Sequence, residues 1–167
     1  MRQTEIKEFI IFTMVGALIL CVYAPIFKNS FVHYDNDAHI FENELVTADL
    51  GIHRITNMFR QTIDDIYVPI TTLSFAIEHY FFGINPVVTH TNNLILHIFV
   101  CFLIFKITRI LNFPLPVAAA LFGVHPMHVE SVAWATERKD VLYRYFIFWL
   151  YWCILFIRMF AKYTIYV

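Results

Sequence analysis

The segment FIIFTMVGALILCVYAPIF, residues 9–27, decides the fold class of this chain. It is almost wholly apolar and reaches the roughly 20 residues that a helix needs to cross a bilayer. A signal peptide is the alternative, because Arg2 and Lys7 precede the run. However, the apolar core is longer than the roughly 7–15 residues of the apolar region of a signal peptide, and no small-residue cleavage motif follows it. We therefore predict an uncleaved first transmembrane helix.

The composition of the whole chain also indicates a membrane protein. Of its 167 residues, 59% are hydrophobic and 15% are charged, whereas soluble domains have about 45–50% and 25%. The length allows one domain, and the net charge of -1 provides no overall field that would attract nucleic acid. Cys21, Cys101 and Cys153 all lie in apolar runs. This placement predicts buried thiols and no disulfide framework or zinc site.

Three more apolar stretches follow, and they predict spans at about residues 88–111, 112–130 and 141–160. The middle one is the least regular, because its apolar run at 117–124 is too short to cross roughly 30 Å of hydrocarbon. It must continue through His125 and Pro126 or begin further back, near Ile110. We predict one all-α integral membrane domain with about four transmembrane helices and a large first loop, residues 28–86.

Basic residues flank the predicted spans unevenly, and this asymmetry orients the chain. Lysine and arginine are enriched on the cytoplasmic side of membrane proteins. With four spans, one side of the membrane collects three basic pairs: Arg2 and Lys7, Lys106 and Arg109, and Arg158 and Lys162. We predict that this side is cytoplasmic and that the loop of residues 28–86 is exoplasmic.

The predicted outer loop contains helical segments of its own. Apolar residues recur at helical spacing over residues 52–59 and 71–82. The second segment runs into Gly83 and then Asn85-Pro86, a sequence that ends a helix. We expect these helices to lie along the membrane surface.

A second basic group does not follow the charge rule. Arg138, Lys139 and Arg144 fall on the outer side or at the membrane edge. A bound anion at the outer surface is one explanation, because arginine suits bidentate contact with phosphate and lysine acts as a point charge. Snorkelling of the side chains to lipid headgroups is the other. Asp140 stands where an N-cap would precede the last span, and that helix start would add a positive dipole.

Polar residues elsewhere form three further candidate groups. Asp35 and Asp37 follow the first span and suit general base catalysis or a divalent cation, or simply a solvated turn. A second group shares one helix face and either lines a site or links helices by hydrogen bonds: His90, Asn93 and His97. The third suits proton transfer or an optional metal, or caps a helix at the interface: His125, His128 and Glu130.

The segment HPMHVESVAWATERKDVL, residues 125–142, carries a family resemblance. It resembles the His-Pro to Asp signature of bacterial membrane proteins with tetratricopeptide repeats, which are similar to the transmembrane-and-TPR O-mannosyltransferases of animals in the GT-C glycosyltransferase superfamily. Supporting matches lie upstream in the same order: FVHYD at 31–35, PITTLS at 69–74, FGINP at 82–86, and the stretch from His90 to His97. The resemblance covers nearly the whole chain.

The resemblance implies a polytopic enzyme that transfers a sugar from a polyprenyl-phosphate donor to a protein hydroxyl on the non-cytoplasmic face. Asp35 would be catalytic, with Asp37 as its helper. Arg138, Lys139 and Arg144 would bind the donor phosphate. The remaining polar residues would shape the site or hold an optional divalent cation: His90, Asn93, His97, His125, His128 and Glu130. The bacterial form of the signature favours a bacterial inner membrane, or the endoplasmic reticulum membrane in a eukaryote.

The chain also departs from the family pattern. Asn36 stands where relatives often have a second Asp, and Val68 stands where they tend to have a basic residue or His. Relatives continue into more spans and a TPR array, so we expect an N-terminal portion that works with a second chain carrying those parts. The rival interpretations are a non-catalytic membrane scaffold or inactive remnant, and a small proton or ion carrier that uses the membrane histidines.

Overall fold

The computed structural model describes residues 3–32, 36–113 and 115–165, and this part of the chain is helical without a named strand. The elements run in the order α1 Gln3–Tyr23, η1 Ala24–Lys28, η2 Asp37–Phe41, α2 Glu44–Thr47, α3 Ile52–Met58, α4 Pro69–Phe82, α5 Pro86–Ile110, α6 Leu115–Val124, η3 Pro126–His128, α7 Val129–Ala133 and α8 Arg138–Ile165. The predicted all-α fold class is thus confirmed.

Three helices in the described part are long and apolar enough to cross a membrane: Glu5–Lys28, Pro86–Ile110 and Arg138–Ala161. They correspond to the first, second and fourth predicted spans. Side chains on the last one are exposed almost throughout, since only 6% of its apolar window is buried within the chain. Such a surface is suited to lipid or to further protein.

The predicted span at 112–130 is not one continuous helix. Helix α6 has 10 residues, about 15 Å of helix, which is half of the hydrocarbon thickness. The chain then leaves the helix at His125 and Pro126, where the ring nitrogen of His125 accepts a hydrogen bond from the backbone N–H of Met127 at 3.2 Å. Proline has no backbone N–H to continue a helical ladder. A fourth crossing therefore stays a prediction.

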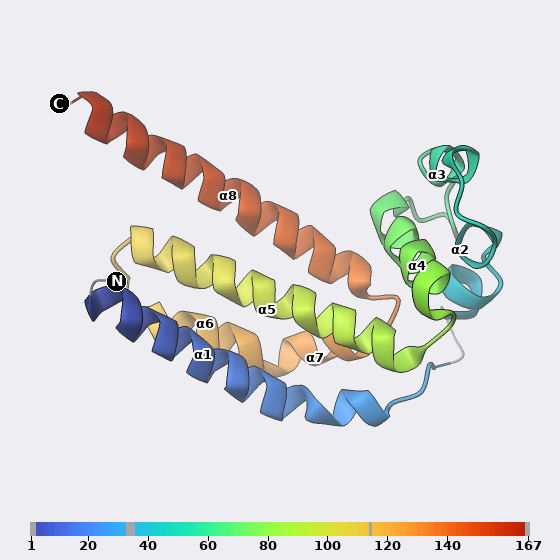
Figure 1. Ribbon diagram of the computed structural model, residues 1–167, viewed down its shortest axis with the longest axis horizontal. Coiled ribbons are helices and arrows are strands. Elements are labelled where there is room, and N and C mark those ends of the chain that lie inside the picture. Colours follow the sequence, from blue (N-terminus) through green and yellow to red (C-terminus); the bar gives the residue numbers. More distant parts are fainter. Residues whose placement is uncertain (1–2, 33–35, 114, 166–167) are drawn as a thin grey trace.

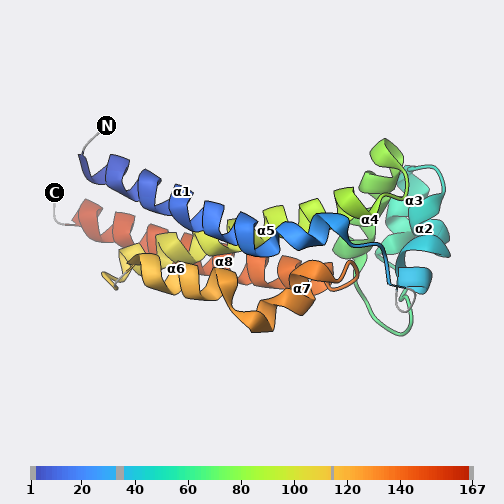
Figure 2. The same cartoon turned by 90° about the horizontal axis from the view of Figure 1, so that it is seen from below.

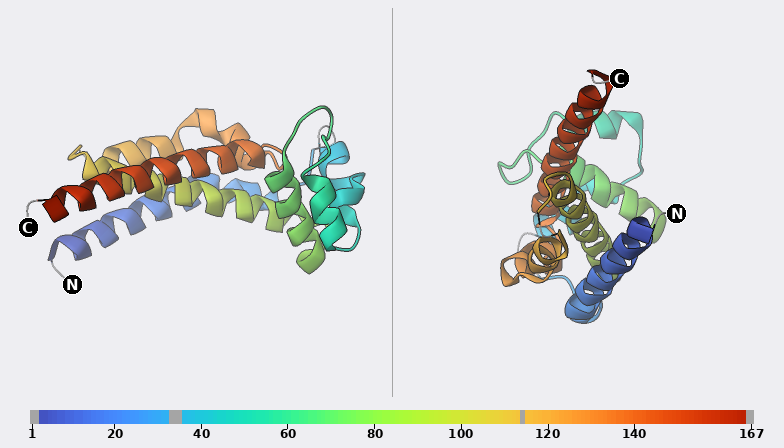
Figure 3. Two further views of the ribbon diagram at one scale, coloured as in Figure 1. Left: turned by 90° about the horizontal axis from the view of Figure 1, so that it is seen from above. Right: turned by 90° about the vertical axis from the view of Figure 1, so that its left-hand side faces the viewer.

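The long helices form a bundle with α5 at its centre, as Figures 1 and 2 show. Helix α5 packs against α1, α6, α7 and α8. The start of α1, the end of α5 and the end of α8 lie at one end of the bundle, and α2, α3 and α4 form a cap at the other (Figure 3). An ion pair of 2.6 Å between Glu8 and Arg109 joins two of these helix ends. Lys7, Arg109 and Arg158 belong to these helix ends, and the side of the membrane that they face stays a prediction.

Helices α1, α5 and α6 approach one another closely at a glycine. A Cβ atom added to Gly123 would lie 2.6 Å from Cδ1 of Ile19 and 3.3 Å from the sulfur of Cys101. Ile19 and Cys101 are fully buried in the same apolar cluster, which also contains Leu94 and Val132. Gly123 is therefore the position that lets α6 fit against the other two helices.

The boundary between cap and bundle follows from local sequence chemistry. Helix α4 ends at Gly83, whose φ of 65° is in the left-handed region that glycine adopts without strain. The side chain of Asn85 then caps α5 by accepting from the N–H of Val87 at 3.0 Å, and Pro86 is the first helical residue. The predicted stop at this place is confirmed.

Candidate functional site

Arg138, the first residue of α8, is buried between the cap and the bundle, with 1% of its surface exposed. Its Nε donates to the side-chain oxygen of Asn93 at 2.6 Å. The two terminal nitrogens donate to the hydroxyl of Ser74 at 3.1 Å and to the backbone oxygen of Thr89 at 3.0 Å. Both also contact the carboxylate of Glu78. All five N–H donors of the guanidinium thus have acceptors inside the protein.

Glu78 completes this network on the acceptor side. One carboxylate oxygen accepts from the hydroxyl of Thr89 at 3.1 Å and the other from the side-chain amide of Asn92 at 2.6 Å. The guanidinium carbon of Arg138 lies 4.3 Å from the centre of the Phe75 ring, a cation–π contact. The network therefore fastens α4, α5 and α8 together at one point.

The sequence did not predict that Glu78 is the partner of Arg138. Arg138 and Glu78 are 60 residues apart, so no local pattern connects them. The signal that existed was helical spacing, because Thr71, Phe75 and Glu78 share the buried face of α4. A carboxylate on the buried face of an amphipathic helix needs a partner, which the sequence alone does not name.

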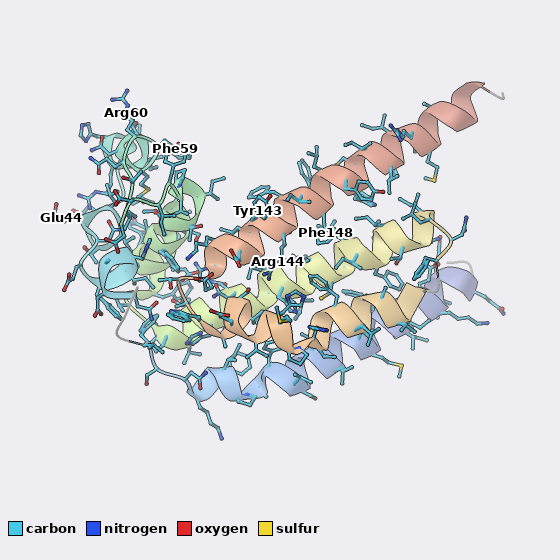
Figure 4. All side chains as sticks on the ribbon, turned by 180° about the vertical axis from the view of Figure 1, so that it is seen from behind. Glu44, Phe59, Arg60, Tyr143, Arg144 and Phe148 are labelled. Atoms are coloured by element: carbon cyan, nitrogen blue, oxygen red, sulfur yellow. The ribbon has the colours of Figure 1, made fainter. Side chains whose placement is uncertain are left out.

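Lys139 and Arg144 are differently placed from Arg138. The ammonium of Lys139 pairs with Glu137 at 2.8 Å and both side chains are partly exposed. One terminal nitrogen of Arg144 donates to the hydroxyl of Ser131 at 2.9 Å. Its other terminal nitrogen is buried without a hydrogen-bond partner in the described part of the chain. Figure 4 shows Arg144 directed from α8 toward the bundle and Tyr143 directed away.

The unpaired nitrogen of Arg144 belongs to a buried polar cluster. The ring of His97 lies 5.6 Å from that of Tyr23 and 5.7 Å from that of His128, between centroids. His97 contacts the backbone oxygen of Gly123 through Nε2 at 3.0 Å. Within the described residues, three further atoms of this cluster have no hydrogen-bond partner: the Tyr23 hydroxyl, His97 Nδ1 and His128 Nδ1.

His128 lies in η3, outside the three candidate spans. Burial lowers the pKa of His128 to about 4, and the nearby charge of Arg144 and the rings of His97 and His125 act in the same direction. The imidazole is therefore neutral near pH 7 and available as a hydrogen-bond donor or acceptor.

The three polar residues predicted on one face of α5 have different neighbours. His90 lies beside Phe31, with ring centroids 6.2 Å apart, at the start of the first loop. Asn93 joins Arg138, and His97 joins Tyr23 and His128. The three residues share one helix face as predicted, but they do not converge on one point.

The group predicted at residues 125–130 shows no metal geometry. His125 and Glu130 are exposed, and the rings of His125 and His128 are 6.0 Å apart between centroids. Among the described residues, no three histidine, cysteine or acidic side chains are placed to hold a metal ion.

Of the two predicted catalytic residues, Asp35 and Asp37, the structure describes only the second. Asp35 lies outside the described residues. Asp37 begins η2 and is half-buried. Asn36, between them, is buried and donates from its side chain to the backbone oxygen of Val32 at 2.8 Å. The side chain of Asn36 thus stabilises the conformation of the loop.

The predicted N-cap role of Asp140 is wrong. Helix α8 begins two residues earlier, at Arg138, and Asp140 lies in its first turn. The earlier start follows from the burial of Arg138, because its network fixes the chain at that residue.

Known proteins similar to this chain were found by sequence. Human protein O-mannosyl-transferase TMTC1 is 33% identical over 166 residues, which is 90% of this chain and 17% of that protein. Human protein O-mannosyl-transferase TMTC4 is 28% identical over 77% of this chain and 20% of its own length. Human protein O-mannosyl-transferase TMTC2 is 30% identical over 75% of this chain and 16% of its own length. No family model and no solved structure matches the chain.

These relatives support the family that the motifs indicate. The chain spans about a fifth or less of the length of the relatives it matches.

Proposed function

We propose that this chain, like the protein O-mannosyl-transferases it is similar to, serves a membrane glycosyltransferase reaction of the GT-C type. The sugar would pass from a polyprenyl-phosphate donor to a hydroxyl of an acceptor protein, on the side of the membrane where the cap lies. The alternative is a non-catalytic scaffold or inactive remnant of such an enzyme. The activity of the whole relatives is part of this proposal, because the chain covers so little of their length.

One observation carries the proposal: the motif segments meet in a buried polar layer where the cap joins the bundle. Ser74 from the PITTLS segment and Asn93 from the histidine segment both bond to Arg138 of the signature. Ionisable side chains buried in a membrane protein are costly, and they are candidates for functional sites. The network brings three of the motif segments to one level of the molecule, and the donor-binding test below separates an enzyme from a scaffold.

The proposed donor site contains Arg144 and Lys139 but not Arg138, although the signature predicted that all three bind the donor phosphate. Arg138 has no donor left for a phosphate, so we assign it to positioning α8 against the cap. Arg144 has one unpaired buried nitrogen, while its other terminal nitrogen also lies 3.4 Å from the carboxylate of Asp140. Lys139 is partly exposed and pairs with Glu137. Charge-assisted contacts from Arg144 and Lys139 would stabilise the developing charge on the departing phosphate.

The proposed reaction is a single displacement. The acceptor hydroxyl oxygen forms a bond to the anomeric carbon, and the bond from that carbon to the phosphate oxygen breaks. The electron pair leaves with the lipid phosphate, and the hydroxyl proton passes to the carboxylate of Asp35, with Asp37 as helper. His90, His97, His125 and Glu130 would shape the site, and a divalent cation is an optional addition.

The proposed topology places the cap outside the cytoplasm. Helix α6 would return the chain through the membrane, and the break at Pro126 would leave η3 and α7 at the outer boundary. The membrane would be the inner membrane of a bacterium or, in a eukaryote, that of the endoplasmic reticulum. A second chain would supply further spans and the repeat array.

Donor binding tests the proposal directly. The full chain in nanodiscs would be titrated with a fluorescent polyprenyl-phosphate mannose, and transfer to a serine- and threonine-rich peptide would be followed with and without EDTA. We expect Arg144→Ala to weaken donor binding at least tenfold, a loss typical of one charged hydrogen bond. Asp35→Asn should abolish transfer and leave donor binding intact.

Arg158→Ala is the matched control, because Arg158 lies on the same helix near the opposite end. Equal donor binding by the parent, Arg144→Ala and Arg158→Ala would refute the donor site. No donor binding by a folded chain would favour the scaffold or remnant.

A further inference from the structure

The cap contains a polar cavity that the proposed reaction does not use. It lies between α2, α3 and the turn after α3, and its volume is about 400 Å³. This is within the range of about 300–1,000 Å³ typical of small-molecule sites. Eight of its eleven lining residues have polar side chains, and the apolar ones are Ala38, Leu45 and Ile63.

Hydrogen bonds hold the walls of this cavity in place. Arg54 donates to the backbone oxygen of Glu44 and so ties α3 to α2. The side chain of Asn43 accepts from the N–H of Leu45 at 3.0 Å and donates to the backbone oxygen of His39 at 3.2 Å. Met58 anchors the far end of α3, with 1% of its surface exposed. The cavity is therefore preformed.

The charges around the cavity select against anions. Two acidic residues, Glu42 and Glu44, line the cavity together with one guanidinium, that of Arg54, which already bonds to the backbone. A phosphate or an acidic peptide would meet a net negative rim. A protein partner usually contributes an apolar anchor that needs an apolar pocket, and this cavity offers little such surface.

The remaining groups suit a ligand rich in hydroxyls. His53 and Asn57 are one helical turn apart on α3, and the ring nitrogen of His53 lies 3.4 Å from the amide nitrogen of Asn57. Gln61 is exposed and continues the same wall. Side-chain amides both donate to and accept from neighbouring hydroxyl groups, and carboxylates accept from them.

The position of the cavity separates it from the lipid donor. Helices α2 and α3 pack on each other and on α4, at the end of the molecule opposite the two chain termini (Figure 1). A ligand would reach it from the aqueous side. We infer that the cap cavity binds a neutral sugar ring presented from solution, such as a sugar already attached to an acceptor. This goes beyond the proposed transfer and holds whether or not transfer occurs.

The test uses the full chain in nanodiscs and the probe methyl α-D-mannopyranoside, followed by saturation-transfer NMR. We expect binding with a Kd of the order of 1 mM. Loss of one hydrogen-bonding side chain should weaken it roughly 2–12-fold, so Asn57→Ala and Gln61→Ala should each raise the Kd by this factor. Thr56→Ala and Arg60→Ala are matched controls, because both neighbours lie outside the cavity lining, and they should bind like the parent.

Other outcomes overturn the inference. Absence of a sugar signal, or equal binding by the parent and Asn57→Ala, removes the cavity as a sugar site. A serine- and threonine-rich peptide that binds in place of the sugar, and is lost in Asn57→Ala, shows that the ligand class is wrong. Because no lipid donor is present, a failure of transfer does not affect this result.

Discussion

Arg138 carries a full positive charge into the interior, and only its partners make that placement tolerable. Removing one partner of a buried ion pair leaves an uncompensated charge or unsatisfied groups, which costs about 3–5 kcal/mol. We therefore expect Arg138→Ala to lower the free energy of unfolding by this amount. Thermal unfolding of the protein in nanodiscs, followed by circular dichroism, would measure it.

The neighbouring ion pair supplies the control for this prediction. Lys139 and Glu137 are both partly exposed, and such pairs contribute about 1 kcal/mol or less. Lys139→Ala should thus unfold close to the parent. The double variant Arg138→Met with Glu78→Leu should recover only part of the lost stability, since an apolar pair can replace a buried ionic one but leaves Asn92 and Asn93 without partners. A stable Arg138→Ala protein would contradict the positioning role.

His128 makes stability depend on pH in a defined direction. Its pKa falls from 6.5 to about 4 on folding, so the unfolded chain binds more protons between these values. The free energy of unfolding should therefore decrease as the pH falls from about 6.5 toward 4. Melting temperatures at pH 7.5 and pH 5 would show a difference that His128→Asn reduces. His53→Asn, in the exposed part of the cap, should keep the difference seen in the parent.

At the scale of helices, the packing of α6 depends on Gly123. Alanine there gains helix propensity of up to about 1 kcal/mol, but its Cβ would lie 2.6 and 2.8 Å from two carbons of the buried Ile19. Overpacking of this kind costs about 1–3 kcal/mol, so we expect Gly123→Ala to destabilise the fold. The melting temperature of the variant in nanodiscs measures the balance.

Gly16 is the matched control, because it lies in α1 and its Cβ would meet no atom within 4 Å. Gly16→Ala should be neutral or stabilising. Ile19→Val removes the Cδ1 atom and should restore part of the stability of Gly123→Ala, which a double-mutant cycle would reveal. Additive effects of the two changes would show that the contact is not the cause.

Helix positions were largely predictable because their signals are local. The Gly83 and Asn85-Pro86 stop, the helix beginning at Ile52 and the long apolar runs all act within a few residues. The exact start of α8 was not predictable, because it depends on Arg138 meeting Glu78 across 60 residues. The break in the third apolar stretch was visible as Pro126, but its packing against α5 depends on the tertiary fit at Gly123.

At the scale of the molecule, the candidate site follows the same rule. Its residue types can be read from the sequence, and the signature at residues 125–140 indicates where to look for a site, but the site itself stays a prediction. The sequence could not show which arginine has all its donors occupied, because a fully bonded guanidinium and one with an unpaired nitrogen look the same in sequence. Arg138 and Arg144 are six residues apart and have opposite surroundings.

The arrangement of the bundle predicts how the chain crosses the membrane. The start of α1 lies at the opposite end from the cap (Figure 2), so Gln3 and Arg60 should face different compartments. Helix α6 runs back toward the cap, so Met127 should share the compartment of Arg60 if the short α6 completes a fourth crossing. Asn112 should share that of Gln3.

Single cysteines at these four exposed positions would decide the matter. The native Cys21, Cys101 and Cys153 are first replaced by serine, and intact bacterial spheroplasts are treated with a membrane-impermeant maleimide. We expect labelling of Arg60→Cys and Met127→Cys before permeabilisation, and of Gln3→Cys and Asn112→Cys only afterwards. If Met127→Cys instead behaves like Gln3→Cys, the segment from α6 to α7 does not cross. Arg144 and the cap would then face different sides, and the donor site could not be as proposed.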